Sequence, residues 1–226
     1  MDEDLVRVGA LKVHLGTAKT WIKNYFDEDR NRESKEPYAF PAYEDFDTGS
    51  APETLNDGDL LAPALLNVRP SLAAFYGLQS VRGELEEGLV ATSESVTLQS
   101  AVEDGTLRQR LLPFISFLDS NHRHGVGLTT VTKILHRKRP EFMPLHDKFV
   151  KRCYYGTAPG HPVQPSRSRS TVDYWASMCT AINEDLVRQP EVWARFSEIP
   201  RRQTVSPLRL LDVVAWKAGR SAAQYK

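Results

Sequence analysis

Apolar residues recur at helical spacing along most of the chain. The clearest case is residues 128–135, where Val131, Ile134 and Leu135 are spaced i, i+3 and i+4 and therefore share one face of a helix. Strand signals are scarce, and only residues 5–15 mix alternating with helical spacing. The pattern predicts an all-α protein of about nine or ten helices, with at most a small β-hairpin near the N-terminus.

A Gly-x-Gly turn precedes the helix predicted at 128–135. One glycine of such a turn can take a positive φ, and the other lets an incoming group approach the backbone closely. The first N–H groups of the helix have no helical partners and attract anions. We therefore predict contact with the phosphates of a nucleic-acid backbone, made by the turn, neighbouring hydroxyls and nearby cations: Gly125, Val126, Gly127, Thr129, Thr130, Lys133, Arg137 and Lys138. The alternative is a purely structural turn between two helices.

A second predicted helix, 107–118, ends shortly before this turn, so the local unit is helix, glycine turn, helix. Over residues 107–155 the sequence resembles the helix-hairpin-helix DNA glycosylase superfamily, whose hairpin binds the DNA backbone. In that family a catalytic aspartate follows an apolar-Pro-apolar stretch, and Asp147 stands at that position, after Met143-Pro144-Leu145-His146. Members with lyase activity carry a lysine where this chain has Thr129, so the resemblance implies a monofunctional glycosylase.

The resemblance assigns the chemistry to one carboxylate. Hydrolysis of an N-glycosidic bond builds positive charge on the sugar, and a nearby carboxylate stabilises that charge and orients or deprotonates the attacking water. Asp147 is therefore the candidate catalytic residue, and His146 is a candidate for positioning water or contacting phosphate. The alternatives are a helix N-cap for Asp147 and a surface or capping role for His146. We expect neither a cofactor nor a metal at this site.

Three functions remain open at this point. The first is a monofunctional DNA glycosylase that acts on a modified or damaged base. The second is a non-catalytic helix-hairpin-helix module that binds DNA without releasing a base. The third is the same fold acting on a small nucleoside-like ligand, with the acidic segment 31–58 closing the cleft.

The charges balance overall, but they are unevenly distributed. The chain has 29 lysines and arginines and 29 aspartates and glutamates, giving a formal net charge of +0. Residues 26–60 hold eleven acidic against three basic residues, whereas residues 133–152 hold seven basic against two acidic residues. The positive excess near the glycine turn agrees with a nucleic-acid partner, for which we expect DNA. The acidic stretch would repel a polyanion, which is the main argument for a small ligand instead.

Two features in and directly after the acidic segment 31–58 have two interpretations each. Its aromatic residues either stack on an extruded base or pack into the core: Tyr38, Phe40, Tyr43 and Phe46. Asp57 and Asp59 either hold a metal and activate water, or they cap and charge the first turn of the helix that begins there. We expect the core and capping roles.

The composition predicts a globular protein of the cytoplasm. Cys153 and Cys179 are too few for a disulfide framework, which favours a reducing compartment, and no stretch approaches the roughly twenty apolar residues of a membrane span. We expect one domain, 1–226, with two lobes: a helical bundle formed by 1–105 plus 171–226, and a helix-hairpin-helix lobe with its following loop, 106–170.

Overall fold

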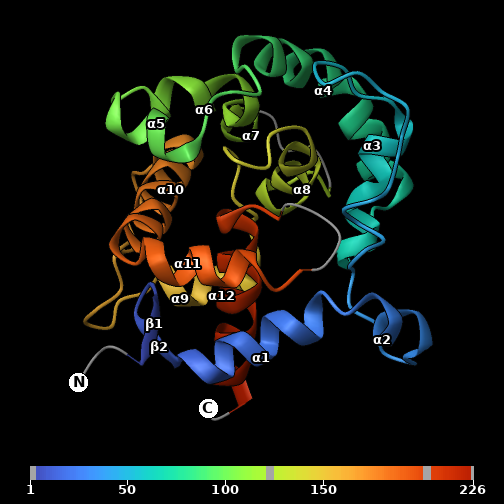
Figure 1. Cartoon of the computed structure of the whole chain (residues 1–226). Coiled ribbons are helices and arrows are strands. Elements are labelled where there is room, and N and C mark those ends of the chain that lie inside the picture. Colours follow the sequence, from blue (N-terminus) through green and yellow to red (C-terminus); the bar gives the residue numbers. More distant parts are fainter. Residues whose placement is uncertain (1–3, 121–124, 201–204, 225–226) are drawn as a thin grey trace. The chain divides into compact units, whose positions relative to one another are not determined.

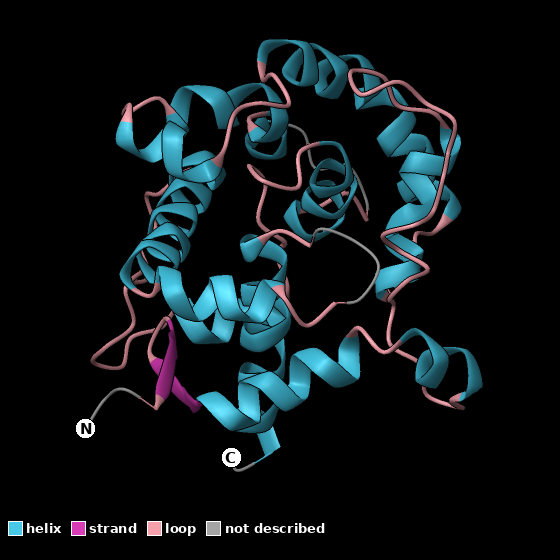
Figure 2. Ribbon diagram, viewed as in Figure 1, coloured by secondary structure: helices cyan, strands magenta, loops and turns pink. Residues whose placement is uncertain are grey.

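The computed structural model describes residues 4–120, 125–200 and 205–224, most of which are helical (Figures 1 and 2). It begins with an antiparallel hairpin, in which β1 (Leu5–Val8) pairs with β2 (Leu11–His14) and Val6 lies opposite Val13. The helices are α1 (Leu15–Tyr25), α2 (Glu28–Glu33), α3 (Asp57–Leu61), the 3-10 helix η1 (Ala62–Leu66), α4 (Leu72–Ala91), α5 (Leu98–Glu103), α6 (Leu107–Ile115), α7 (Phe117–Ser120), α8 (Leu128–Lys138), α9 (Lys148–Tyr154), α10 (Thr171–Arg188), α11 (Pro190–Ser197) and α12 (Pro207–Gln224).

The chain forms two compact units, and the first contains both ends of the chain. Unit 1 consists of Met1–Phe40, His146–Arg167 and Ser177–Lys226. Its central helix is α12, which packs against α1, α9 and α11 and against the N-terminal hairpin. The buried side chains of unit 1 come from all of these elements, and they include Val6, Ile22, Val150, Trp193 and Leu211.

Unit 2 consists of Pro41–Leu145 and Ser168–Ala176. Here α4 packs along α6, and α8 packs on η1 and α6. The core residues of unit 2 include Leu78, Leu85, Phe114, Ile134 and Trp175. The connection from residue 41 to residue 56 contains no helix or strand, and it lies against α8 through hydrogen bonds that are described below.

The prediction of a mostly helical protein with a small hairpin near the N-terminus is confirmed. The helix predicted at 107–118 is divided into α6 and α7, and residues 121–124, which include His124 of the predicted turn, lie outside the described part. A helix-hairpin-helix motif is therefore not shown. The two units also divide the chain differently from the predicted lobes, because residues 41–105 fall in the same unit as α8 rather than with the chain ends. Within the described ranges, no helix is long and apolar enough to cross a membrane.

Candidate functional site

The predicted glycine turn is present in unit 2, at the start of α8. Gly125 has a positive φ of 77°, and a Cβ placed there would lie 2.7 Å from the Cβ of Ala74 on α4, so both the turn and the packing require glycine. Gly127 is the extended N-cap residue of α8 and has open space around its Cα. Val126 and Thr130 are buried, while Thr129 is half-buried. The turn thus packs on α4, which fits the structural alternative.

The cations predicted to support phosphate binding have another role. Lys133 donates from Nζ to the carbonyl oxygen of Leu66 at 2.9 Å. Arg137 donates to the carbonyl oxygens of Tyr43 and Phe46. Lys138 donates to Ser50 Oγ at 2.6 Å and forms an ion pair with Asp59 at 3.5 Å. Since the connection 41–56 has no secondary structure of its own, its backbone needs such donors. Lys133, Arg137 and Lys138 therefore hold this connection and η1 on α8.

Arg139 completes this arrangement, although its place in the basic run 133–152 did not indicate a buried role. The side chain is 2% exposed, and its donors reach the carbonyl oxygens of Thr92 at 2.5 Å, Leu89 at 2.6 Å and Pro52 at 3.0 Å. Burial lowers the pKa of the Arg139 guanidinium from its ordinary value. The fork of donors satisfies carbonyl groups at the C-terminal end of α4, which have no partners within that helix.

Most of the candidate residues in and next to the acidic segment have structural roles, in core packing or helix capping. Phe40 and Tyr43 are buried, and the Tyr43 hydroxyl donates to the carbonyl oxygen of Lys133 at 2.6 Å. Asp59 belongs to the capping box at the start of α3, and Asp57 pairs with Arg82. Burial would raise the pKa of Asp59, but hydrogen bonds to its carboxylate and the nearby Lys138 lower it overall. The described residues contain no cluster of side chains suited to hold a metal.

Asp147 and His146 lie in unit 1, whereas the glycine turn lies in unit 2. Asp147 is the N-cap of α9, and its Oδ1 accepts a hydrogen bond from the backbone N–H of Phe149 at 2.7 Å. The capping interpretation of Asp147 is therefore confirmed. His146 is half-buried immediately before the cap. The predicted catalytic residues, Asp147 and His146, thus belong to a different unit from the predicted phosphate site at the glycine turn.

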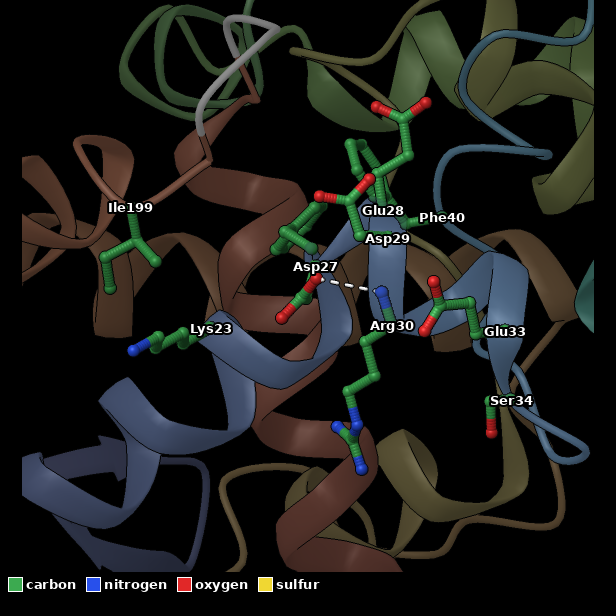
Figure 3. A pocket seen from close by; sticks show the side chains of 10 residues that line it. Lys23, Asp27, Glu28, Asp29, Arg30, Glu33, Ser34, Phe40 and Ile199 are labelled. Atoms are coloured by element: carbon green, nitrogen blue, oxygen red, sulfur yellow. Dashed lines mark hydrogen bonds between the residues drawn. The ribbon is translucent and has the colours of Figure 1, made fainter.

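A cavity of about 860 Å³ opens in unit 1 between the end of α1 and α2 (Figure 3). It is lined by Lys23, Phe26, Asp27, Glu28, Asp29, Arg30, Glu33, Ser34, Phe40 and Ile199. Four carboxylates stand against two cations in this lining, so a polyanion would be repelled. Asp27 is also used structurally, because its carboxylate accepts from the N–H of Arg30 as the N-cap of α2. Of the candidate residues named from the sequence, Phe40 of the acidic segment lines this cavity, whereas none of the predicted catalytic or phosphate-binding residues does.

A different group of cations lies on α9 and α12, in unit 1. We call Lys148, Arg152, Lys217 and Arg220 the α9–α12 basic face. Each cation lies over an aromatic ring: Lys148 Nζ is 4.9 Å and Arg152 Cζ 5.8 Å from the centre of Phe149, Lys217 Nζ is 4.3 Å from that of Tyr38, and Arg220 Cζ is 5.7 Å from that of Trp216. Lys217 also donates to the Tyr38 hydroxyl at 2.5 Å. Cation–π contacts therefore restrain all four side chains, of which Lys148, Arg152 and Arg220 are exposed and Lys217 is half-buried.

The two helices that carry these cations are in very close contact. A Cβ added at Gly219 would lie 2.1 Å from the carbonyl oxygen of Phe149, so the backbone of α12 touches that of α9. The Arg152 guanidinium donates to the carbonyl oxygen of Gly219 at 3.0 Å, and Cys153 Sγ donates to that of Ala215 at 3.2 Å. Burial raises the pKa of the Cys153 thiol to about 12, so it remains a neutral donor. The spacing between the α9 and α12 cations is therefore fixed by backbone packing.

These cations also differ from Lys138 of α8, which has an acidic partner in Asp59. None of the four forms an ion pair with any residue in the described ranges, whereas Lys138 is paired with Asp59. Unit 1 contains 19 lysines and arginines against 14 aspartates and glutamates, while unit 2 contains 10 against 15. The neutral chain is thus composed of a basic and an acidic unit, and the glycine turn belongs to the acidic one.

Comparison with known proteins corrects the resemblance drawn from the sequence. A family model described as "Family of unknown function (DUF6308)" matches residues 18–219, and no glycosylase family matches. The assignment to the helix-hairpin-helix glycosylases is therefore wrong. It depended on short local motifs in 107–155, and such motifs also arise where a glycine turn packs on a neighbouring helix and an aspartate caps the next one. Nothing matches among curated proteins or solved structures. Because the match covers most of its length, the chain belongs to the family of unknown function DUF6308.

Proposed function

We propose that this protein binds nucleic acid through the α9–α12 basic face. The observation that carries the proposal is the set of four cations that are held over aromatic rings and have no ion-pair partner in the described chain. Cations that are not neutralised by carboxylates can replace the counterions of a phosphate backbone, and this release supplies most of the affinity of nucleic-acid binding. Aromatic rings between the cations are typical of surfaces that also contact bases.

The glycine turn at the start of α8 gives less support to the same function. The nearby cations Lys133, Arg137 and Lys138 are bound to carbonyl oxygens and a carboxylate of unit 2. Unit 2 is acidic overall, so its long-range field opposes the approach of a polyanion. The partner expected from the sequence is retained in this proposal, and its binding site is moved to unit 1.

The proposal concerns binding and includes no reaction. The catalytic role of Asp147 rested on the glycosylase resemblance, and capping of α9 accounts for its position and its hydrogen bond to Phe149. The surface of α9 and α12 offers cations and rings rather than an acid and a base beside a cavity. This corresponds to the second of the functions left open by the sequence, a non-catalytic nucleic-acid-binding protein, without its helix-hairpin-helix motif.

The test is the affinity of the intact protein for fluorescently labelled single-stranded and duplex oligonucleotides of mixed sequence at low salt, measured by anisotropy. Arg220→Glu is expected to weaken binding by about tenfold, because an exposed cation becomes a repelling anion. Lys35→Glu is the matched control, since Lys35 is an exposed cation of the same unit outside the face. If wild-type protein binds neither form, or if both variants lose affinity equally, the proposal is wrong.

A further inference from the structure

We infer that the α9–α12 basic face selects single-stranded nucleic acid by stacking unpaired bases on the guanidinium planes of Arg152 and Arg220. The inference rests on the proposed function and adds the class of strand that is bound. It concerns the two arginines of the face, which differ from its two lysines in having a flat, delocalised cation that can stack.

Each arginine is backed by an aromatic ring of its own helix. Arg220 follows Trp216 by four residues, so both lie on the same side of α12, and its Cζ is 5.7 Å from the centre of the indole. Arg152 follows Phe149 by three residues on α9, and its Cζ is 5.8 Å from the centre of the phenyl ring. Both arginines are exposed, whereas both rings are half-buried. Each arginine thus combines an exposed residue with a cation that lies against a half-buried ring.

The pairs are held in place before any ligand binds. Arg152 is fixed by its hydrogen bond to the carbonyl oxygen of Gly219, and this bond also ties it to the helix that carries Arg220. Ordering a long side chain on binding costs conformational entropy, so arginines that are already restrained bind with less entropic loss. The close contact of Gly219 with Phe149 fixes the two arginine–ring pairs relative to each other.

A guanidinium plane can stack only on the flat face of a base, and that face is accessible only in unpaired bases. In a duplex the base faces are covered by their neighbours in the stack, so a protein reaches phosphates and base edges but not those faces. A single strand presents base faces beside its phosphates, and proteins bind such bases on aromatic rings and arginine planes. A guanidinium that stacks on a base keeps its positive charge beside the phosphates of the same strand, and Lys148 and Lys217 add two further cations for those phosphates. Stacking requires no particular base, so we expect little sequence preference.

The experiment separates stacking from charge by exchanging arginine for lysine. The variant Arg152→Lys/Arg220→Lys keeps all four positive charges but removes both planes. Its affinity for an oligothymidylate is expected to fall about five- to thirtyfold, since the contact of a planar cation with a base is worth ~1–2 kcal/mol. Its affinity for a duplex of the same length is expected to change less than twofold. Wild-type protein should bind the single strand more tightly than the duplex.

Arg32→Lys/Arg195→Lys is the matched control, because both arginines are exposed in unit 1 and lie outside the face. An unchanged melting temperature establishes that each variant is folded, and the exposed Arg220 tolerates substitution best. An oligouridylate repeats the test with RNA, and a loss with either strand supports the inference. Duplex binding that equals single-strand binding, or a lysine variant that binds the single strand as wild type does, would overturn it and leave the proposed function intact. Absence of any nucleic-acid binding would overturn both.

Discussion

Replacing Gly219 by alanine is expected to destabilise the protein, although alanine favours helices more than glycine does. The added methyl carbon would lie 2.1 Å from the carbonyl oxygen of Phe149 and 2.7 Å from its carbonyl carbon. Both atoms belong to the backbone of α9, so they cannot move aside as a side chain does, and the two helices must separate. Overpacking costs about 1–3 kcal/mol, and helix propensity returns only ~1 kcal/mol. Because the added carbon meets backbone atoms at 2.1 and 2.7 Å, we expect the upper part of the overpacking range, about 2–3 kcal/mol, and therefore a net loss of about 1–2 kcal/mol in the free energy of unfolding.

Urea unfolding followed by far-UV circular dichroism measures this loss, and Gly83→Ala is the matched control. Gly83 lies in the middle of α4, where nothing is within 4 Å of an added Cβ, so alanine there should stabilise by about 0.5–1 kcal/mol. The two substitutions are chemically identical and have opposite expected signs. A Gly219→Ala protein that is as stable as wild type, or that gains stability as Gly83→Ala does, would refute the close contact between α9 and α12.

Three further predictions concern buried polar groups. Arg139→Lys should cost about 2–4 kcal/mol in chemical denaturation, because lysine lacks the fork of donors and leaves buried carbonyl oxygens unpaired; a loss below 1 kcal/mol would contradict this. Tyr43→Phe should cost about 1–2 kcal/mol in the same assay through the lost bond to Lys133, and an unchanged midpoint would argue against that bond. Burial raises the pKa of the Asp185 carboxyl above its ordinary value of 3.8, so the carboxyl binds its proton more tightly in the folded state than in the unfolded state. Stability should therefore fall as pH rises from that value through the raised pKa, and Asp185→Asn should remove this component of the fall; identical pH profiles would count against it.

Local features of the sequence predicted local structure correctly. Val131, Ile134 and Leu135 indicated an apolar stripe, and all three are buried in α8. Asp147 stands directly before the first residue of α9 and caps that helix, as the N-cap interpretation predicted. In each case the responsible residues are within a few positions of one another, so spacing along the chain is sufficient evidence.

The cations show what the sequence does not reveal. Lys133, Arg137 and Lys138 form a basic run next to a glycine turn, but their partners are up to 94 residues distant along the chain. A sequence shows the charge of such residues and not the carbonyl oxygens that surround them. Their neighbours in space decide whether they contact a ligand or support a loop.

The same reason explains why the α9–α12 basic face was missed. The run at 133–152 already included Lys148 and Arg152, and the spacing of Trp216 and Arg220 was a usable signal for an exposed arginine over a ring. The contact between Phe149 and Gly219 joins these pieces across 70 positions, and nothing in the local pattern predicts it. Charge clusters therefore need the fold before they indicate a surface.

The dependence of single-strand affinity on salt tests the central claim most directly. Each phosphate that a protein cation neutralises on a single strand contributes about −0.7 to the slope of the logarithm of the binding constant against the logarithm of salt concentration. The four cations of the α9–α12 basic face therefore predict a slope of about −3, which becomes about −2 in Arg220→Gln. Lys35→Gln should leave the slope unchanged. A slope near zero, or one that Arg220→Gln does not reduce, would contradict nucleic-acid binding at this face.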